Sequence, residues 1–108
     1  MHAIIEKNKE KLLILCKKHF VKSLYVFGSV TGNNFNNKSD LDFLYEINTK
    51  NFIGWGSGKM DYADNLFALE EGLQTIFERK IDMVPDTIIT NKYMKKNIEK
   101  SKQLVYAD

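Results

Sequence analysis

The chain has 108 residues, of which 44% are hydrophobic and 28% charged, with a formal net charge of +2. This length suits one domain, and the composition is typical of a globular protein rather than of a disordered or collagen-like one. No apolar run approaches the roughly 20 residues that cross a bilayer, and no signal-peptide pattern begins the chain, so we expect no membrane contact. Cys16 is the only cysteine and can form no internal disulfide, which fits a cytoplasmic protein.

The first half of the chain predicts a helix followed by two strands. Apolar residues at helical spacing indicate an amphipathic helix over about residues 3–19, and the aromatic and β-branched run 23–27 indicates a strand that stops at Gly28. Residues 28–38 are rich in Gly, Asn and Ser, which predicts a turn or one helical turn and then a loop. Residues 40–47 alternate as a strand does, with one face made of Leu41, Phe43, Tyr45 and Ile47 and the other of Asp40, Asp42, Leu44 and Glu46.

The second half predicts two more helices and two more strands. After a glycine-rich connection over 48–60, a helix runs from about Asp61, whose side chain can cap it, to about Glu78. Its apolar side consists of Leu66, Phe67, Leu69, Leu73, Ile76 and Phe77. A strand over 80–84, a helix over 91–100 and a strand over 103–106 complete the order α-β-β-α-β-α-β. We therefore expect an α/β (α+β) fold, a small mixed sheet of three to four strands flanked by helices, as a single domain over residues 1–108.

The pattern that indicates chemistry is Gly28-Ser29 followed, after ten residues, by Asp40-Leu41-Asp42. Residue frequencies give this pattern by chance in about one in a thousand chains of this length. A glycine lets the backbone approach a ligand closely, and a helical turn after it directs N–H groups and the Ser29 hydroxyl at an anion such as a triphosphate. Carboxylates two residues apart on a strand lie about 7 Å apart, which suits one or two Mg²⁺ ions.

A third carboxylate is expected from Asp82, which lies between apolar residues in the third predicted strand. If that strand pairs with the second, Asp82 projects onto the face of Asp40 and Asp42, where it could bind metal and accept a proton from an attacking hydroxyl. The alternative is the solvated face of an antiparallel sheet. Because aspartate is depleted in strands and three like charges repel without a cation, we favour the catalytic interpretation.

Three segments resemble the signature of the minimal nucleotidyltransferases, a family of the DNA polymerase β-like superfamily: residues 27–29, 39–44 and 80–84. The resemblance implies a polymerase β palm-like nucleotidyltransferase fold, triphosphate binding by Gly28 and Ser29, and two Mg²⁺ ions held by Asp40, Asp42 and Asp82. Many members, the MntA-like antitoxins, transfer AMP from ATP to a tyrosine hydroxyl of a HEPN-domain ribonuclease toxin. The resemblance therefore implies a protein adenylyltransferase with ATP as its substrate and a HEPN-domain toxin as its partner.

Two other functions remain open. The first is a non-catalytic antitoxin that inhibits its partner by occlusion, against which the intact set of aspartates argues. The second is a nucleotidyltransferase acting on RNA or a small molecule, against which the small size of the chain argues. Direct nucleic-acid binding is not expected, because Arg79 is the only arginine among 16 basic residues and the lysines are scattered.

Several weaker signals have structural explanations. The segment from Gly54 to Met60 fails the P-loop pattern, and we expect its Trp55 either in a mobile or partner-contacting loop or packed against the sheet edge. Glu46 lies about 13 Å beyond Asp42 and is expected in solvent. Packing roles are expected for His19, Cys16, Tyr25, Tyr45 and Tyr106.

Overall fold

The computed structural model describes residues 3–32, 35–36, 39–52, 61–86 and 92–108, so the Gly54–Lys59 loop with Trp55 lies outside the described residues. Four strands form one sheet in the order β3-β2-β1-β4. β1 pairs antiparallel with β2 and with β4, whereas β2 and β3 are parallel. The predicted mixed sheet is confirmed; its strands are β1 (Val21–Phe27), β2 (Leu41–Ile47), β3 (Ile81–Pro85) and β4 (Gln103–Ala107).

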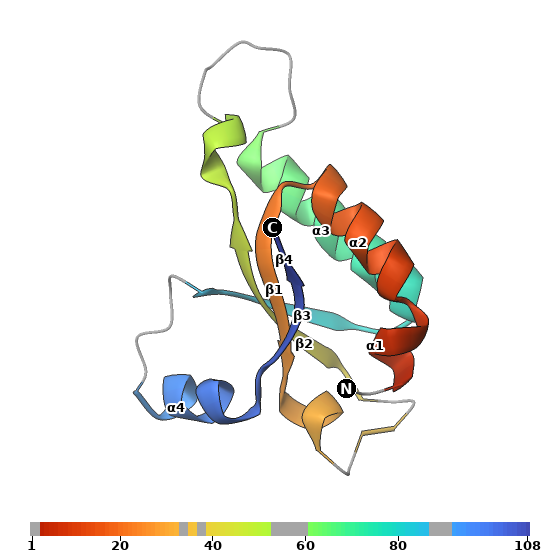
Figure 1. The fold of residues 1–108 in the computed structure, drawn as a ribbon, viewed down its shortest axis with the longest axis vertical. Coiled ribbons are helices and arrows are strands. Elements are labelled where there is room, and N and C mark those ends of the chain that lie inside the picture. The colour runs from red at the N-terminus through yellow and green to blue at the C-terminus, as the bar shows by residue number, and fades with distance from the viewer. Residues whose placement is uncertain (1–2, 33–34, 37–38, 53–60, 87–91) are drawn as a thin grey trace.

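The helices α2 (Lys9–Lys18) and α3 (Tyr62–Phe77) lie side by side over one face of the sheet, with the short α1 (Ala3–Lys7) beside them (Figure 1). α4 (Lys92–Ser101) lies apart from these helices and contacts the 3₁₀ turn η1 (Gly28–Thr31). A second 3₁₀ turn, η2 (Thr49–Phe52), follows β2. None of the helices in the described parts of the chain has the length and apolar character needed to cross a bilayer.

The single helix predicted over residues 3–19 is interrupted at Asn8, so that prediction is corrected to two helices. The Asn8 backbone N–H bonds to the Ile5 carbonyl, and the Asn8 side-chain amide donates to the Ile4 carbonyl at 2.9 Å. The side chain thus takes the acceptor that the backbone N–H would use in a continuous helix. This local competition, which asparagine favours, turns the chain between α1 and α2.

The core lies between the helices and the sheet. Its fully buried side chains include Leu12 and Cys16 of α2, Leu69 and Leu73 of α3, and Leu24, Val26, Leu41 and Phe43 of the strands. α2 and α3 approach closely at Gly72, where a Cβ atom would meet the side chain of Leu15 at 2.6 Å. Burial raises the pKa of the Cys16 thiol to about 12, as expected for a packing residue.

The ends of α3 agree with the prediction, but one residue of its apolar face does not. Asp61 caps the helix by accepting a hydrogen bond from the Asp64 N–H at 2.8 Å. Phe67, expected in the core, is 62% exposed, because it lies on the side of α3 away from the sheet. Asn65 is buried instead, and it joins α3 to α2 through His19: its amide donates to the His19 carbonyl at 2.8 Å, and its side-chain oxygen lies 3.0 Å from His19 Nδ1.

Candidate active site

Three strand ends meet at one edge of the sheet and bring the predicted site residues together. β2 and β3 both begin there because they are parallel, and β1 ends there because it is antiparallel to β2. In the register, Asp42 lies opposite Phe27 at the end of β1 and opposite Asp82 at the start of β3. α2 and α3 cover the sheet face that carries Leu41 and Phe43, so the two carboxylates project from the other face.

Gly28 sits directly against this carboxylate pair. Its φ of +76° lies in the left-handed region, and a Cβ atom placed on it would overlap Asp42 Oδ2. Both the turn into η1 and the close approach to Asp42 therefore require glycine. η1 confirms the predicted single helical turn, and it begins beside the Asp42 carboxylate. The Ser29 side chain lies outside the described part of the structure, so its contact with a nucleotide stays a prediction.

The neighbouring carboxylates perturb Asp42. The pKa of Asp42 is raised from 3.8 to about 6, first by burial, then by the charge of Asp82 and a hydrogen bond with it, and then by the charge of Asp40. Burial and like charge both disfavour the ionised form, and a bound cation would remove the second effect. A carboxyl group with a raised pKa, placed beside a second carboxylate, is typical of a functional site.

Asp40 is placed differently from the other two aspartates. It precedes the first residue of β2, and its Oδ2 lies 4.0 Å from Lys80 Nζ, with both side chains largely open to solvent. Across the described residues, no three Asp, Glu, His or Cys side chains converge closely enough to hold one ion. Mg²⁺ in nucleotide sites commonly takes one or two protein carboxylates and completes its shell with phosphate oxygens and water. The oxygen donors of Asp42 and Asp82 fit that requirement, and the space kept free at Gly28 adjoins them.

One residue beside the site was missed by the sequence analysis. Arg79 follows α3 and hydrogen-bonds the backbone of the loop that leads into Asp40. Two features of the sequence could have pointed to it: Arg79 is the only arginine of the chain, and it lies three residues before Asp82.

The other polar and aromatic candidates have structural partners of their own. Glu46, at the far end of β2, pairs with Lys22 at 3.4 Å, as expected for a solvated residue. Tyr45 is buried, and burial together with the neighbouring Tyr62 raises its pKa to about 12. Tyr25 lies on the same sheet face as Asp42, where Lys102 Nζ covers its ring at 4.6 Å from the centroid.

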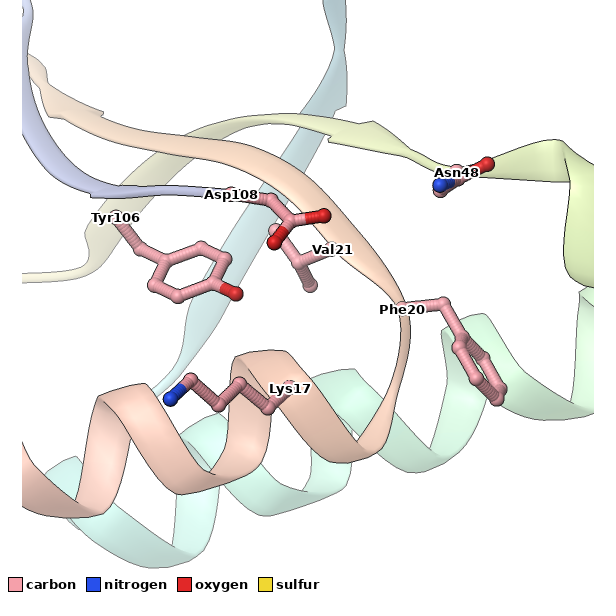
Figure 2. A pocket seen from close by; sticks show the side chains of 6 residues that line it. All are labelled: Lys17, Phe20, Val21, Asn48, Tyr106 and Asp108. Carbon is pink, nitrogen blue, oxygen red and sulfur yellow. The ribbon is translucent and has the colours of Figure 1, made fainter.

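A small cavity lies at the opposite end of β1 from Gly28 (Figure 2). It is formed by the end of α2, the first residue of β1 and the end of β4, and its lining consists of Lys17, Phe20, Val21, Asn48, Tyr106 and Asp108. It shares no residue with the candidate site formed by Gly28, Asp42 and Asp82.

Comparison with known sequences agrees with this geometry. The profile of a family described as a nucleotidyltransferase domain matches residues 8–105. A protein of Methanocaldococcus jannaschii that is named a protein adenylyltransferase is 35% identical over 104 residues, covering 95% of this chain and 90% of that protein. A second protein of the same organism with the same name is 32% identical over 103 residues, with the same coverage.

Comparison with solved structures identifies the same fold. A structure described as a minimal nucleotidyltransferase superposes with a TM-score of 0.68 at 20% identity, and 95% of each chain is covered. A toxin–antitoxin crystal structure with AMP-PNP gives a TM-score of 0.63 at 14% identity, covering 94% of this chain and 74% of the other. A tri-AMPylated Shewanella oneidensis HEPN toxin in complex with an MNT antitoxin gives 0.55 at 13% identity, covering 96% and 73%.

Proposed function

The chain belongs to the nucleotidyltransferase domain family, as one of its minimal members, and we propose that it transfers AMP from ATP to a hydroxyl group of a partner protein with the help of Mg²⁺. One observation carries the proposal: Gly28, Asp42 and Asp82 come from three different strand ends and meet at one edge of the sheet. A side-chain-free turn next to paired carboxylates suits a phosphate chain and the cation that accompanies it.

Each of these residues has a defined task in the proposed reaction. Gly28 and Ser29 bind the β- and γ-phosphates, because Gly28 has no side chain and so leaves room for phosphate oxygens beside Asp42. Asp42 and Asp82 orient the α-phosphate, with Asp40 joining them when an ion is bound. Mg²⁺ held by these carboxylates would neutralise charge on the phosphates, which would favour departure of pyrophosphate.

The bond changes are those of an in-line displacement. The acceptor oxygen attacks the α-phosphorus, the bond from that phosphorus to the bridging oxygen of the β-phosphate breaks, and pyrophosphate leaves. In this proposal Asp82 accepts the proton of the attacking hydroxyl. Catalysis then depends mainly on alignment and on charge neutralisation, which a rigid sheet edge supplies.

The proposed acceptor is a tyrosine hydroxyl of a HEPN-domain toxin, and the proposed role is that of an antitoxin. The support comes from relatives: the M. jannaschii proteins are named protein adenylyltransferases, and a protein of the same fold is bound to an AMPylated HEPN toxin. AMP on such a tyrosine would add a bulky anion to the toxin and so silence it.

The test uses ATP labelled at either the α- or the γ-phosphate, incubated with the protein, Mg²⁺ and a purified HEPN-domain toxin encoded beside its gene. Label from the α-position alone on the toxin tyrosine is expected. Asp42→Asn should abolish it. Glu46→Gln is the matched control, because Glu46 lies on the same face of β2 but pairs with Lys22 away from the site.

Two results would contradict the proposal. No label on the toxin, with undiminished inhibition by Asp42→Asn, would instead identify a binding module that acts by occlusion. Label on RNA or on a small molecule, with none on protein, would assign a different acceptor to the same active site.

A further inference from the structure

Arg79 holds the loop that precedes the catalytic aspartates. Its Nη1 donates hydrogen bonds to the carbonyl oxygens of Asn36 and Ser39, each at 3.1 Å. Its guanidinium carbon lies 4.7 Å from the centroid of the Phe35 ring, within the range of a cation–π contact. One side chain therefore contacts three residues of this loop, and we call these contacts the Arg79 clasp.

Two further hydrogen bonds join Asn36 to Ser39, the residues that Arg79 contacts. The Ser39 N–H donates to the Asn36 carbonyl at 3.1 Å, and the Asn36 N–H donates to Ser39 Oγ at 3.1 Å. The Asn36 carbonyl thus accepts from both the loop and Arg79. Ser39 is followed by Asp40 and then by the first residue of β2, so the position of Ser39 bears on where β2 begins.

The clasp joins β2 to β3 where the site forms. Arg79 lies two residues before β3, and the Leu41 N–H bonds to the Lys80 carbonyl at 3.1 Å, which starts the parallel pairing that places Asp42 opposite Asp82. The Arg79 side chain and the neighbouring Lys80 backbone therefore fix the start of β2 against the start of β3. Together they determine how far the Asp42 carboxylate of β2 lies from the Asp82 carboxylate of β3.

Arginine has properties at this position that lysine lacks. Its planar guanidinium rests its face on the Phe35 ring while one of its nitrogens, Nη1, bonds both carbonyl groups, whereas an ammonium group is a compact charge with no such plane. Arg79 Nε is buried and has no hydrogen-bond partner among the described residues. A buried donor without an acceptor costs free energy.

We propose that Arg79 is a positioning residue, which holds the Asn36–Ser39 turn so that Asp40 and Asp42 are aligned with Asp82 for metal binding. Mg²⁺ requires nearly ideal octahedral geometry, so a small displacement of one carboxylate weakens its binding. Groups that orient metal ligands typically change metal affinity or activity by about 10- to 100-fold when they are replaced. The proposal rests on the proposed function for its activity measurement, but its metal-binding measurement stands apart from it.

The primary test is Arg79→Lys, which keeps the charge and removes the planar fork. Mn²⁺ alone is titrated into the full chain, and free Mn²⁺ is followed by electron paramagnetic resonance. We expect the dissociation constant to rise by about tenfold or more. In AMP transfer, the Mg²⁺ concentration for half-maximal rate should rise in parallel and kcat should fall, while KM for ATP at saturating Mg²⁺ changes by less than about twofold.

Two further variants separate alignment from charge and from misfolding. Lys80→Gln removes a positive charge beside Asp40 but leaves the clasp intact, and it should change the Mn²⁺ dissociation constant by less than about twofold because exposed ion pairs are weak. Ser39→Ala removes only the Ser39 Oγ acceptor of the Asn36 N–H. Because that hydrogen bond is exposed, its loss leaves the core intact. This variant should weaken Mn²⁺ binding in the same direction as Arg79→Lys and by a smaller factor.

Unchanged Mn²⁺ binding in both Arg79→Lys and Ser39→Ala would overturn the proposal, as would an equal loss in Lys80→Gln. So would a wild-type chain that binds no Mn²⁺ at millimolar concentration. A wild-type chain that binds Mn²⁺ but transfers no AMP would count against the proposed function only, and the Mn²⁺ titrations would still decide the role of Arg79.

Discussion

Asp42 and Asp82 lie opposite each other in the parallel register of β2 and β3, and their carboxyl groups are hydrogen-bonded. The pair combines two features that are unfavourable without a cation, partial burial and like charge. The pair therefore lowers the free energy of unfolding at the candidate site, as is common in active sites.

The first prediction concerns pH and stability without metal. The pKa of Asp42 is raised from 3.8 in the unfolded chain to about 6 in the folded one, so the folded state binds its proton more tightly. The stabilising effect is full below the unfolded pKa and is lost as pH rises through about 4 to 6. Chelator-treated protein should lose about 1 kcal/mol of unfolding free energy between pH 4 and 7 from this group, a figure reduced for its partial exposure.

Urea titrations at a series of pH values measure this loss, and Asp42→Asn should flatten the profile over that range. Added Mg²⁺ should raise the melting temperature of the wild type at pH 7 and leave that of Asp42→Asn unchanged, since only the native site binds the ion. A wild-type profile that rises from pH 4 to 7 in parallel with that of the variant would contradict the assignment.

The second prediction concerns Gly28→Ala. The left-handed φ and the overlap of a Cβ atom with Asp42 Oδ2 should displace both η1 and the carboxylate. We expect AMP transfer to fall by about 100-fold or more and stability by about 1–2 kcal/mol. Gly72→Ala is the matched control: its Cβ would meet only the movable end of Leu15, so transfer should stay near wild type. Equal losses in the two variants would refute the special role of Gly28.

The third prediction concerns the buried pair of Asn65 and His19. Asn65→Ala removes a donor to the His19 carbonyl and a partner of its ring, leaving buried polar groups unpaired. We expect a loss of about 2–3 kcal/mol in urea unfolding, with kcat unchanged, because the pair joins α2 to α3 on the far face of the sheet. Thr75→Ala, on the exposed side of α3, should cost less than about 0.5 kcal/mol. A large drop in kcat for the Asn65 variant in its folded form would show a coupling that the contacts do not predict.

The fourth prediction concerns Glu78, which ends α3 with a left-handed φ of 51°. Glycine adopts this conformation without strain and is the usual residue at such helix ends. Glu78→Gly should therefore raise the unfolding free energy by about 0.5–1 kcal/mol, measured by thermal or urea denaturation. A decrease would indicate that the Glu78 side chain makes a stabilising contact that outweighs the backbone strain.

The parts of the fold that could be predicted from sequence are those determined by local periodicity. Alternation over residues 40–47 placed Asp42 on the face away from the apolar side of β2, and glycine after an apolar strand indicated the turn at Gly28. The order of helices and strands along the chain also followed from these patterns, apart from the break that divides the first helix.

The features that were not predicted depend on contacts between distant residues or on side-chain competition with the backbone. Burial of Asn65 becomes favourable only once His19 lies beside it, 46 residues away. Asn8 interrupts the first helix by bonding the Ile4 carbonyl, which a periodicity of apolar residues cannot reveal. The Arg79 clasp likewise exists only after the loop and β3 have come together.

The parallel pairing of β2 and β3 has a consequence for the order in which parts of the protein fold. Asp42 and Asp82 are separated by a crossover that includes the whole of α3, so they meet only after that helix has docked on the sheet. Pairing of such distant segments is slow relative to the formation of a local hairpin such as β1–β2. A nascent or partly folded chain can therefore form the Gly28 turn and the Asp42 strand while it still lacks Asp82. We therefore expect the proposed transfer activity to appear later in refolding than the β1–β2 hairpin.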